Sequence, residues 1–353
     1  MTQLLAGRTA ANAEFFAAES ERIALLCRDL ARRFQRGGRL LAVGGSPQAW
    51  SDAHHVAVEF VHPVIVGKRA LPALAVAGHE VEPLTGPDDA TIAFEPLRFT
   101  VGDEEWRFDP PTDDPFVRQE LCETLYHVVW ELVHVFFDHL GGSDAGAGAS
   151  SFLYPFLGRG DEDLDAVVED VARSVLMKAD EAGALRQQTL GEGREALEAA
   201  AAELQGEGTL LAFGNGGSAT DAEDVVSDFR AAPQGWPHRR ALDLTESSAI
   251  LSALANDVGA EVLFQRQVIA YGRAGDTVLA LSTSGNSANV LLALEEARRR
   301  GLATIAMVGY DGGRVASEQL ADHVIVTRSE HIPRIQEAQA SAYHVLRELV
   351  EAG

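Results

Sequence analysis

Hydrophobic positions along the first 140 residues change between helical and strand spacing. Residues 10–36 repeat apolar side chains every three to four positions, which predicts an amphipathic helix ending at the glycines of positions 37 and 38. Helical spacing returns over 51–62 and 115–139. Short apolar runs at 39–43, 70–76 and 90–94 predict buried strands, and the alternation over 95–110 predicts a hairpin around Gly102. This half is therefore expected to mix strands with covering helices.

The second half repeats the alternation more regularly. Helical spacing over 161–182 and 191–205 is followed by predicted strands at 209–213, 241–244, 277–281, 303–308 and 323–326, and by a last helix over 333–351. Strands that alternate with helices favour a parallel sheet covered on both faces. Between the halves, residues 141–158 are rich in Gly, Ala and Ser near their start, which predicts a linker.

The two halves share a motif, which indicates a tandem duplication. Residues 37–59 and 206–228 both contain a short apolar strand, a Gly-Gly-Ser turn and a helix start with Asp-Ala. Each half also ends with a helix that carries Gln and His eight positions apart, Gln119 and His127 in one and Gln336 and His344 in the other. We therefore expect two related domains, residues 1–140 and 159–353.

Composition narrows the class of protein. The chain has 353 residues, 46% of them hydrophobic, and a formal net charge of −24, which argues against binding nucleic acid or an anionic membrane. It has two cysteines, no apolar stretch of membrane-spanning length and no signal-peptide pattern at the start. These features predict a cytoplasmic globular protein.

Two loops carry the pattern of an anion site. FGNGGS at 213–218 and LSTSGNS at 281–287 each follow a predicted strand and precede a helix. Glycines let the backbone approach a ligand, and the N–H groups of a helix start attract an anion. One such turn is more often only a tight turn before a helix, but two in one sheet favour a phosphate held from both sides.

These loops, with ANDVG at 255–259 and RIQEAQASAYH at 334–344, resemble the sugar isomerase (SIS) domain family, in its phosphoheptose isomerase branch. The resemblance covers residues 160–353 closely and residues 10–140 faintly. It implies an α/β protein of two SIS-type domains, each a mainly parallel sheet flanked by helices in a flavodoxin-like three-layer sandwich, the first one degenerate. It also implies a ketose–aldose isomerase that converts sedoheptulose 7-phosphate or a related phosphosugar through an enediol.

The resemblance assigns roles to residues of the second half. The substrate-binding positions that it implies are Asn215, Ser218, Asp257, Ser282, Thr283, Ser284 and Ser287. Where this branch has a His and a Glu four apart, the second half has Asp224 and Asp228, and where it has an Asp before Arg-Ile-Gln the chain has Pro333. At these three positions the second half departs from the family pattern.

The first half keeps the missing acid–base set. His55 and Glu59 are four apart and therefore share one face of a helix, as do Gln119 and His127 two turns apart. Carboxylate and imidazole suit the proton transfers of an isomerase, and two imidazoles with a carboxylate suit zinc. We expect Glu59 and His127 to be catalytic and His55, Glu59, Gln119 and His127 to hold zinc; buried or surface histidines with no such role are the alternative.

The second half offers a weaker alternative set. It consists of the acidic pair and the Gln and His of the last helix: Asp224, Asp228, Gln336 and His344. Asp228 and His344 would be its catalytic members, although an acidic solvated helix face explains the two aspartates equally well. Because each half keeps what the other lacks, we expect one site shared between the repeats, with a phosphorylated sugar, a heptose phosphate, as ligand.

Two further possibilities stay open. The family resemblance implies dimers and tetramers, so a homodimer with four SIS domains is expected. A protein of this fold can also be a sugar-phosphate sensor, or a regulator of the kind that associates with a replication initiator, and such a protein would bind a phosphosugar without turnover.

Overall fold

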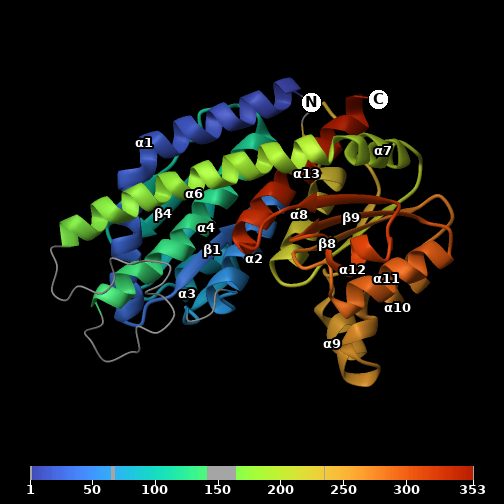
Figure 1. The fold of residues 1–353 in the computed structure, drawn as a ribbon. Helices are drawn as coiled ribbons and strands as arrows, with labels where there is room; N and C mark the ends of the chain where they lie inside the picture. Colours follow the sequence, from blue (N-terminus) through green and yellow to red (C-terminus); the bar gives the residue numbers. More distant parts are fainter. Residues whose placement is uncertain (1, 65–67, 141–163, 234, 353) are drawn as a thin grey trace. The chain divides into compact units, whose positions relative to one another are not determined.

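The structure is a computed structural model that describes residues 2–64, 68–140, 164–233 and 235–352. The described chain divides into two compact units (Figure 1). The first unit spans residues 6–183, and the second spans residues 184–353 together with the first five residues. The division falls inside a helix, whereas the predicted linker at 141–158 lies outside the described residues.

The first unit contains one five-stranded sheet. Its elements are α1 (Thr2–Gln35), β1 (Leu40–Gly44), α2 (Pro47–Val61), β2 (Ala73–Ala77), the 3-10 turn η1 (Gly78–Glu80), α3 (Val81–Leu84), β3 (Ala90–Phe94), β4 (Leu97–Val101), β5 (Glu104–Arg107), α4 (Pro115–Leu140) and the first part of α6 (Leu164–Glu192). The strand order is β2-β1-β3-β4-β5, and helices α1, α2 and α4 contribute most of the core around it. The predicted strands and the hairpin at Gly102 are confirmed.

This sheet is mixed, which corrects the prediction that it is mainly parallel. β1 runs parallel to β2 and β3, whereas β3, β4 and β5 are successively antiparallel. The reason is the length of the connections, because only two residues separate β3 from β4 and β4 from β5. A two-residue turn can join antiparallel neighbours but cannot make the crossover that a parallel pair needs.

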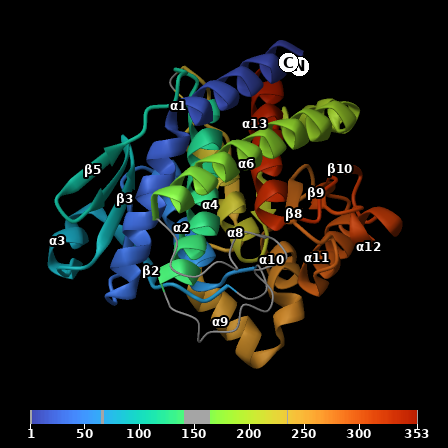
Figure 2. The same ribbon diagram turned by 60° about the vertical axis from the view of Figure 1, so that its left-hand side comes forward.

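The second unit is a fully parallel α/β domain. After the end of α6 come α7 (Arg194–Leu204), β6 (Leu210–Phe213), α8 (Gly217–Arg230), β7 (Ala241–Asp243), α9 (Ser248–Asp257), the 3-10 turn η3 (Ala260–Val262), α10 (Leu263–Tyr271), β8 (Thr277–Ser282), α11 (Ala288–Arg299), β9 (Ala303–Gly309), α12 (Gly313–Ser317), β10 (His323–Thr327) and α13 (Ile332–Ala352). The strand order is β10-β9-β8-β6-β7, with every pair parallel. Figure 2 shows α11 and α13 at this sheet in a second view.

Both faces of this second sheet are covered, as alternate residues of β6 show. Leu210 and Ala212 belong to one buried cluster together with residues of α7, α8 and α13. Leu211 and Phe213 belong to another, together with residues of α10 and α11. Successive side chains of a strand point to opposite faces, so the two clusters are the two faces of the sheet. The unit is therefore a three-layer helix–sheet–helix sandwich, as predicted.

Candidate functional site: an anion cradle and two buried histidine–carboxylate clusters

The order of the second sheet creates a place for a ligand. β6 is the first strand of this sheet in the chain, and it has β7 on one side and β8 on the other. The order in which strands are added to the sheet therefore reverses at β6. In open parallel sheets, ligands bind beyond the carboxyl ends of the strands at such a switch point. The Gly-rich loop after β6 and the Ser-rich loop after β8 are at that edge, because their strands are parallel neighbours.

The loop after β6 brings its backbone close to the start of α8. A Cβ on Gly214 would lie 2.2 Å from the carbonyl oxygen of Ser218, so no larger residue fits there. Gly216, the N-cap of α8, has φ 58, a conformation that favours glycine. Ser218, in the first turn of α8, is buried. The loop therefore presents the amide groups of a 14-residue helix at the edge of the sheet.

The loop after β8 is shaped by its own hydroxyl groups. Ser282 Oγ accepts a hydrogen bond from the Gly285 amide (3.1 Å), and Ser284 Oγ accepts one from the Asn286 amide (3.2 Å). Ser287 is the N-cap of α11, yet its side chain makes no capping hydrogen bond. The Ser287 hydroxyl is thus available to a ligand at the start of this helix.

A pair of amides ties the two loops together. Asn215 Nδ2 donates to Asn289 Oδ1 (3.0 Å), and Asn289 Nδ2 donates back to Asn215 Oδ1 (2.8 Å). Asn289 was not among the predicted residues. The sequence signal for it is its position in the first turn of a predicted helix, two residues after Ser287. The structure thereby joins two loops that lie about 70 residues apart in sequence.

Two acidic residues of this domain differ in their surroundings. The predicted residue Asp257 is exposed at the end of α9, where its carboxylate accepts a hydrogen bond from the Asn256 side chain (2.7 Å). Asp243, which the sequence did not single out, ends β7 beside β6. Burial raises the pKa of Asp243 to about 6, partly offset by hydrogen bonds from the Thr245 hydroxyl (2.6 Å) and amide (2.7 Å). Its carboxyl group can therefore exchange a proton near neutral pH.

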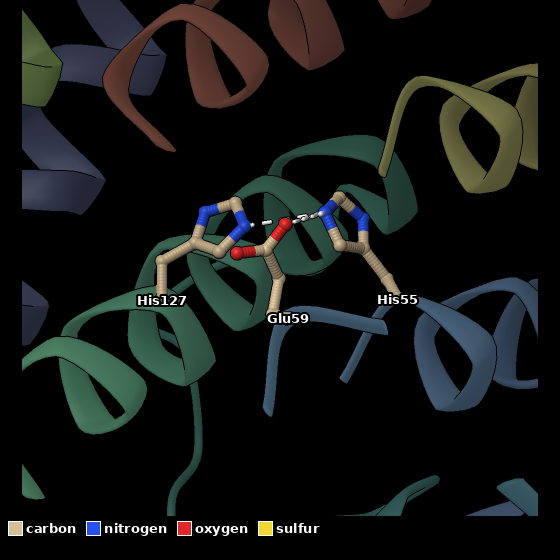
Figure 3. A group of neighbouring side chains, drawn as sticks. All are labelled: His55, Glu59 and His127. Carbon is tan, nitrogen blue, oxygen red and sulfur yellow. Dashed lines mark hydrogen bonds and ion pairs between the residues drawn. The ribbon is translucent and has the colours of Figure 1, made fainter. Parts of the chain in front are cut away.

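In the first unit, the predicted His55, Glu59 and His127 form one buried cluster (Figure 3). His55 and Glu59 lie on α2, whose start is fixed by Ser46, because its Oγ accepts the Ala49 amide (3.1 Å). The Nε2 atoms of His55 and His127 are 3.2 Å apart, and Glu59 Oε1 lies 3.9 Å from His55 Nε2. One atom from each of the three side chains fits within 4.8 Å, close enough to share one ion.

The carboxyl group of Glu59 is under unusual electrostatic conditions. It is 3% exposed, and its Oε2 has no hydrogen-bond partner among the described residues. Burial, with a further contribution from Glu131, raises the pKa of Glu59 to about 8. A buried carboxylate without a donor is costly, and a cation between it and the two imidazoles would remove that cost. Two histidines and one carboxylate are donors that zinc prefers, so the cluster fits zinc.

The fourth predicted member of this set is Gln119. It lies on α4 two turns before His127 and is half-buried. Helix α4 thus carries both residues, as the spacing predicted, whereas the role of Gln119 toward a metal stays a prediction.

The second unit contains the equivalent cluster with shorter acids. His344 Nε2 on α13 lies 3.6 Å from Asp224 Oδ2 and 3.5 Å from Asp228 Oδ2, both on α8. The Tyr343 hydroxyl donates to Asp224 Oδ2 (2.8 Å), so this carboxylate already has a neutral donor. One atom from each of Asp224, Asp228 and His344 lies within 4.8 Å of the others, and all three residues are buried. Gln336, two turns earlier on α13, is buried as well.

The geometry corrects the reading of the two aspartates as a solvated helix face. Asp224 is 4% exposed and Asp228 is 2% exposed, and both face His344 across the packing of α8 against α13. Both repeats therefore place a histidine of their last helix against two residues, four positions apart, of the helix after their first loop. The duplication extends from the sequence to the side-chain geometry.

Comparisons with known proteins agree with this architecture. A model of the SIS domain matches residues 180–309. A phosphoheptose isomerase of Chlorobium phaeobacteroides is 41% identical over 199 residues, which are 54% of this chain and 85% of the relative. One of Pelobacter propionicus is 44% identical over 146 residues, 40% of this chain and 75% of the relative.

A solved structure resembles the whole fold. The C-terminal domain of glucosamine-fructose-6-phosphate aminotransferase from Francisella tularensis aligns with a TM-score of 0.60 at 9% identity, over 99% of this chain and 95% of that one. At this identity the similarity concerns the fold. The topology of the second sheet and the match to the SIS domain model together define an SIS-domain protein. Within that class, the chain belongs to the phosphoheptose isomerase family.

The charge and hydropathy of the helices add one observation. Among the residues that the structure describes, none of the helices is long and apolar enough to cross a membrane.

Proposed function

We propose that this protein binds a sugar phosphate and isomerises it between ketose and aldose forms, with sedoheptulose 7-phosphate or a related phosphosugar as substrate. The observation that carries the proposal is the meeting of two Ser- and Gly-rich loops at the switch point of the second sheet, tied by Asn215 and Asn289. The phosphate is bound there by the amides at the starts of α8 and α11 and by the hydroxyls of Ser218, Thr283, Ser284 and Ser287. Ser282, whose Oγ also accepts the Gly285 amide, is a further phosphate-binding residue, and Asn215 and Asp257 face the sugar.

Proton transfer is the chemistry that the first unit supplies. Isomerisation moves a proton between two adjacent carbons and another between their oxygens, so it needs groups that gain and lose protons near neutral pH. A carboxylate and an imidazole are such groups, so Glu59 is the base, and His127 is the partner that serves the carbonyl oxygen as the enediol forms. His55, 3.2 Å from His127, orients that imidazole.

Zinc is the metal that this cluster would hold, through His55, Glu59, His127 and, by its helix position, Gln119. When bound, it would supply a Lewis acid that polarises the carbonyl group of the sugar. The buried Oε2 of Glu59, which has no hydrogen-bond partner in the part of the chain that the structure describes, supports this assignment. Asp224, Asp228, Gln336 and His344 are the alternative set, with Asp228 and His344 as the acid–base pair.

The two units take different parts in this proposal. The first is a degenerate SIS domain that keeps the His and Glu of the family pattern, and the second is the phosphate-binding SIS domain. That both sets serve one reaction is inferred from the complementary residues of the repeats. A homodimer with four SIS domains is the assembly that the family resemblance favours, and light scattering of the purified protein measures it.

A panel of five- to seven-carbon ketose phosphates, incubated with the protein with and without added zinc, tests the activity. The proposal expects aldose phosphate from sedoheptulose 7-phosphate or a close relative. Binding of these sugars without any aldose product would instead favour a sensor or regulator. One observation favours that second candidate: Asp224 and Asp228 replace the His and Glu of the family pattern, and Asp224 is already paired with Tyr343.

A further inference from the structure

We propose that Tyr310 forms a wall of the phosphosugar site and contacts the sugar part of the ligand, so that it selects among phosphorylated sugars. The inference rests on the proposed function and adds a specificity-determining residue to it. Tyr310 lies outside the SIS model match, which ends at residue 309, and outside the residues that the sequence singled out.

Tyr310 stands at the same edge of the sheet as the phosphate loops. It directly follows β9, which is the parallel neighbour of β8 (Figure 1). The preceding residue, Gly309, packs on the Ser-rich loop so closely that a Cβ there would lie 2.4 Å from the Thr283 carbonyl oxygen. The position of Tyr310 is therefore set by direct contact of its neighbour with a predicted phosphate-binding residue.

The segment after Tyr310 is fastened to the same loop. The Arg314 amide donates to Asn286 Oδ1 (2.9 Å), and the Val315 amide donates to the Gly285 carbonyl oxygen (3.1 Å). A Cβ on Gly313 would lie 2.4 Å from the Ser284 carbonyl oxygen. Both flanks of Tyr310 are thus held against the loop that the phosphate would occupy, which leaves the tyrosine little freedom to move away.

The backbone of Tyr310 has an energetically unfavourable conformation, and the contacts of Tyr310 itself do not explain why it is kept. Its φ is 54, in the left-handed region that favours glycine, and the residues that follow it at 312 and 313 are glycines with positive φ. Its side chain is 36% exposed. A strained, exposed aromatic residue beside a binding loop is typical of a residue kept for its ligand. An aromatic ring offers a flat apolar face with a polar tip, which suits the carbon–hydrogen face and hydroxyls of a sugar.

The test compares two glycine substitutions and two ligands. Tyr310→Gly relieves the left-handed strain, and so does the matched control Gln319→Gly, because Gln319 has φ 52 at the end of α12. Both variants are expected to melt no lower than the parent protein. Tyr310→Gly should weaken sedoheptulose 7-phosphate binding about tenfold and leave inorganic phosphate binding within about twofold, since one well-packed contact corresponds to roughly that factor. Gln319→Gly should change neither affinity.

Unchanged sedoheptulose 7-phosphate affinity in Tyr310→Gly would overturn the inference, and so would an equal loss for both ligands. If the glycine variant melts lower than the parent, Tyr310→Asn replaces it, because asparagine tolerates the left-handed region. Failure of the proposed function has a different signature, in which the parent protein binds neither ligand or Ser284→Ala leaves phosphate binding unchanged.

Discussion

His55 Nε2 lies 3.2 Å from His127 Nε2, although the two residues are 72 positions apart in the chain. Both imidazoles are buried, and Glu59 stands beside them. Two ring nitrogens can face each other at this distance only if one carries a proton that the other accepts, or if a cation lies near both. The side chains of this cluster can therefore exchange a proton with one another or hold a metal ion.

The first prediction concerns zinc. Added zinc should bind with a stoichiometry near one per chain and raise the melting temperature, because a ligand at 100 times its Kd stabilises a fold by about 2.7 kcal/mol. His55→Ala and Glu59→Gln should each weaken zinc binding by at least about tenfold, since each removes one of few strong donors. Calorimetric titration measures the affinity.

The neighbouring histidine provides the control for this experiment. His54 is half-buried against the Trp50 ring and lies outside the cluster. His54→Ala should leave zinc binding unchanged. Equal zinc affinity in the parent, His55→Ala and Glu59→Gln would show that this cluster does not bind zinc.

A second prediction concerns the phosphate loops. Ser284→Ala and Ser287→Ala should each weaken inorganic phosphate and sugar phosphate binding about 10- to 100-fold, because a hydrogen bond to a charged group contributes roughly 1.5–3 kcal/mol. Ser174→Ala is the matched control, because the Ser174 hydroxyl donates to the Asp170 carbonyl oxygen of its own helix α6 (3.0 Å). If the loop variants bind phosphate as the control does, the anion cradle is wrongly assigned.

The third prediction separates the two clusters. Asp228→Asn should leave zinc stoichiometry unchanged and lower turnover less than Glu59→Gln, because Glu59 has the longer side chain and lies with two imidazoles, whereas Asp228 and Asp224 share the single imidazole of His344. Steady-state rates with sedoheptulose 7-phosphate measure this order. Full activity in Glu59→Gln combined with an inactive Asp228→Asn would refute the division of roles between the repeats.

The fourth prediction is a pH dependence of stability. The pKa of Asp243 is about 6 in the folded protein, above the ordinary 3.8, so the folded state holds this proton more tightly than the unfolded state does. The stability that protonation gives is present below about pH 4 and is lost as the pH rises through about 6, at up to roughly 1.4 kcal/mol per pH unit. Asp243→Asn should remove this slope while keeping the acceptor for Thr245.

Chemical denaturation at several pH values between 4 and 7 measures the effect. The free energy of unfolding of Asp243→Asn should vary less with pH over this range than that of the parent protein. If the free energies of unfolding of the two proteins changed with pH in the same way, the pKa of Asp243 would not be raised in the folded protein.

The sequence predicted most elements because each strand and helix is long enough to show its period. The strands of the second sheet lie within one or two residues of the predicted ranges, and the hairpin at Gly102 follows from the alternation around it. The antiparallel pairing of β3 with β4 was missed. Its signal, two-residue connections between short strands, becomes visible only when the strand ends are known to the residue.

Side-chain partners across long separations were the harder part. The helical spacing of His55 with Glu59 and of Gln119 with His127 predicted shared faces, but the meeting of α2 with α4 is a property of the packed unit. Asp224 and Asp228 looked like a solvated acidic face because Glu223 and Asp221 stand beside them, and only packing against α13 reveals their burial. Asp243 and Tyr310 carry no sequence signal of their own, since their character comes from burial and backbone conformation.

The central claim is that the protein turns over a phosphosugar with the acid–base set of its first unit. The most direct test is the rate of aldose formation from sedoheptulose 7-phosphate by the zinc-supplemented protein and its Glu59→Gln variant, with His54→Ala as control. We expect measurable turnover in the parent and the control and a loss of about 100-fold or more in Glu59→Gln, the scale of general acid–base catalysis. Equal turnover in all three proteins would contradict the account.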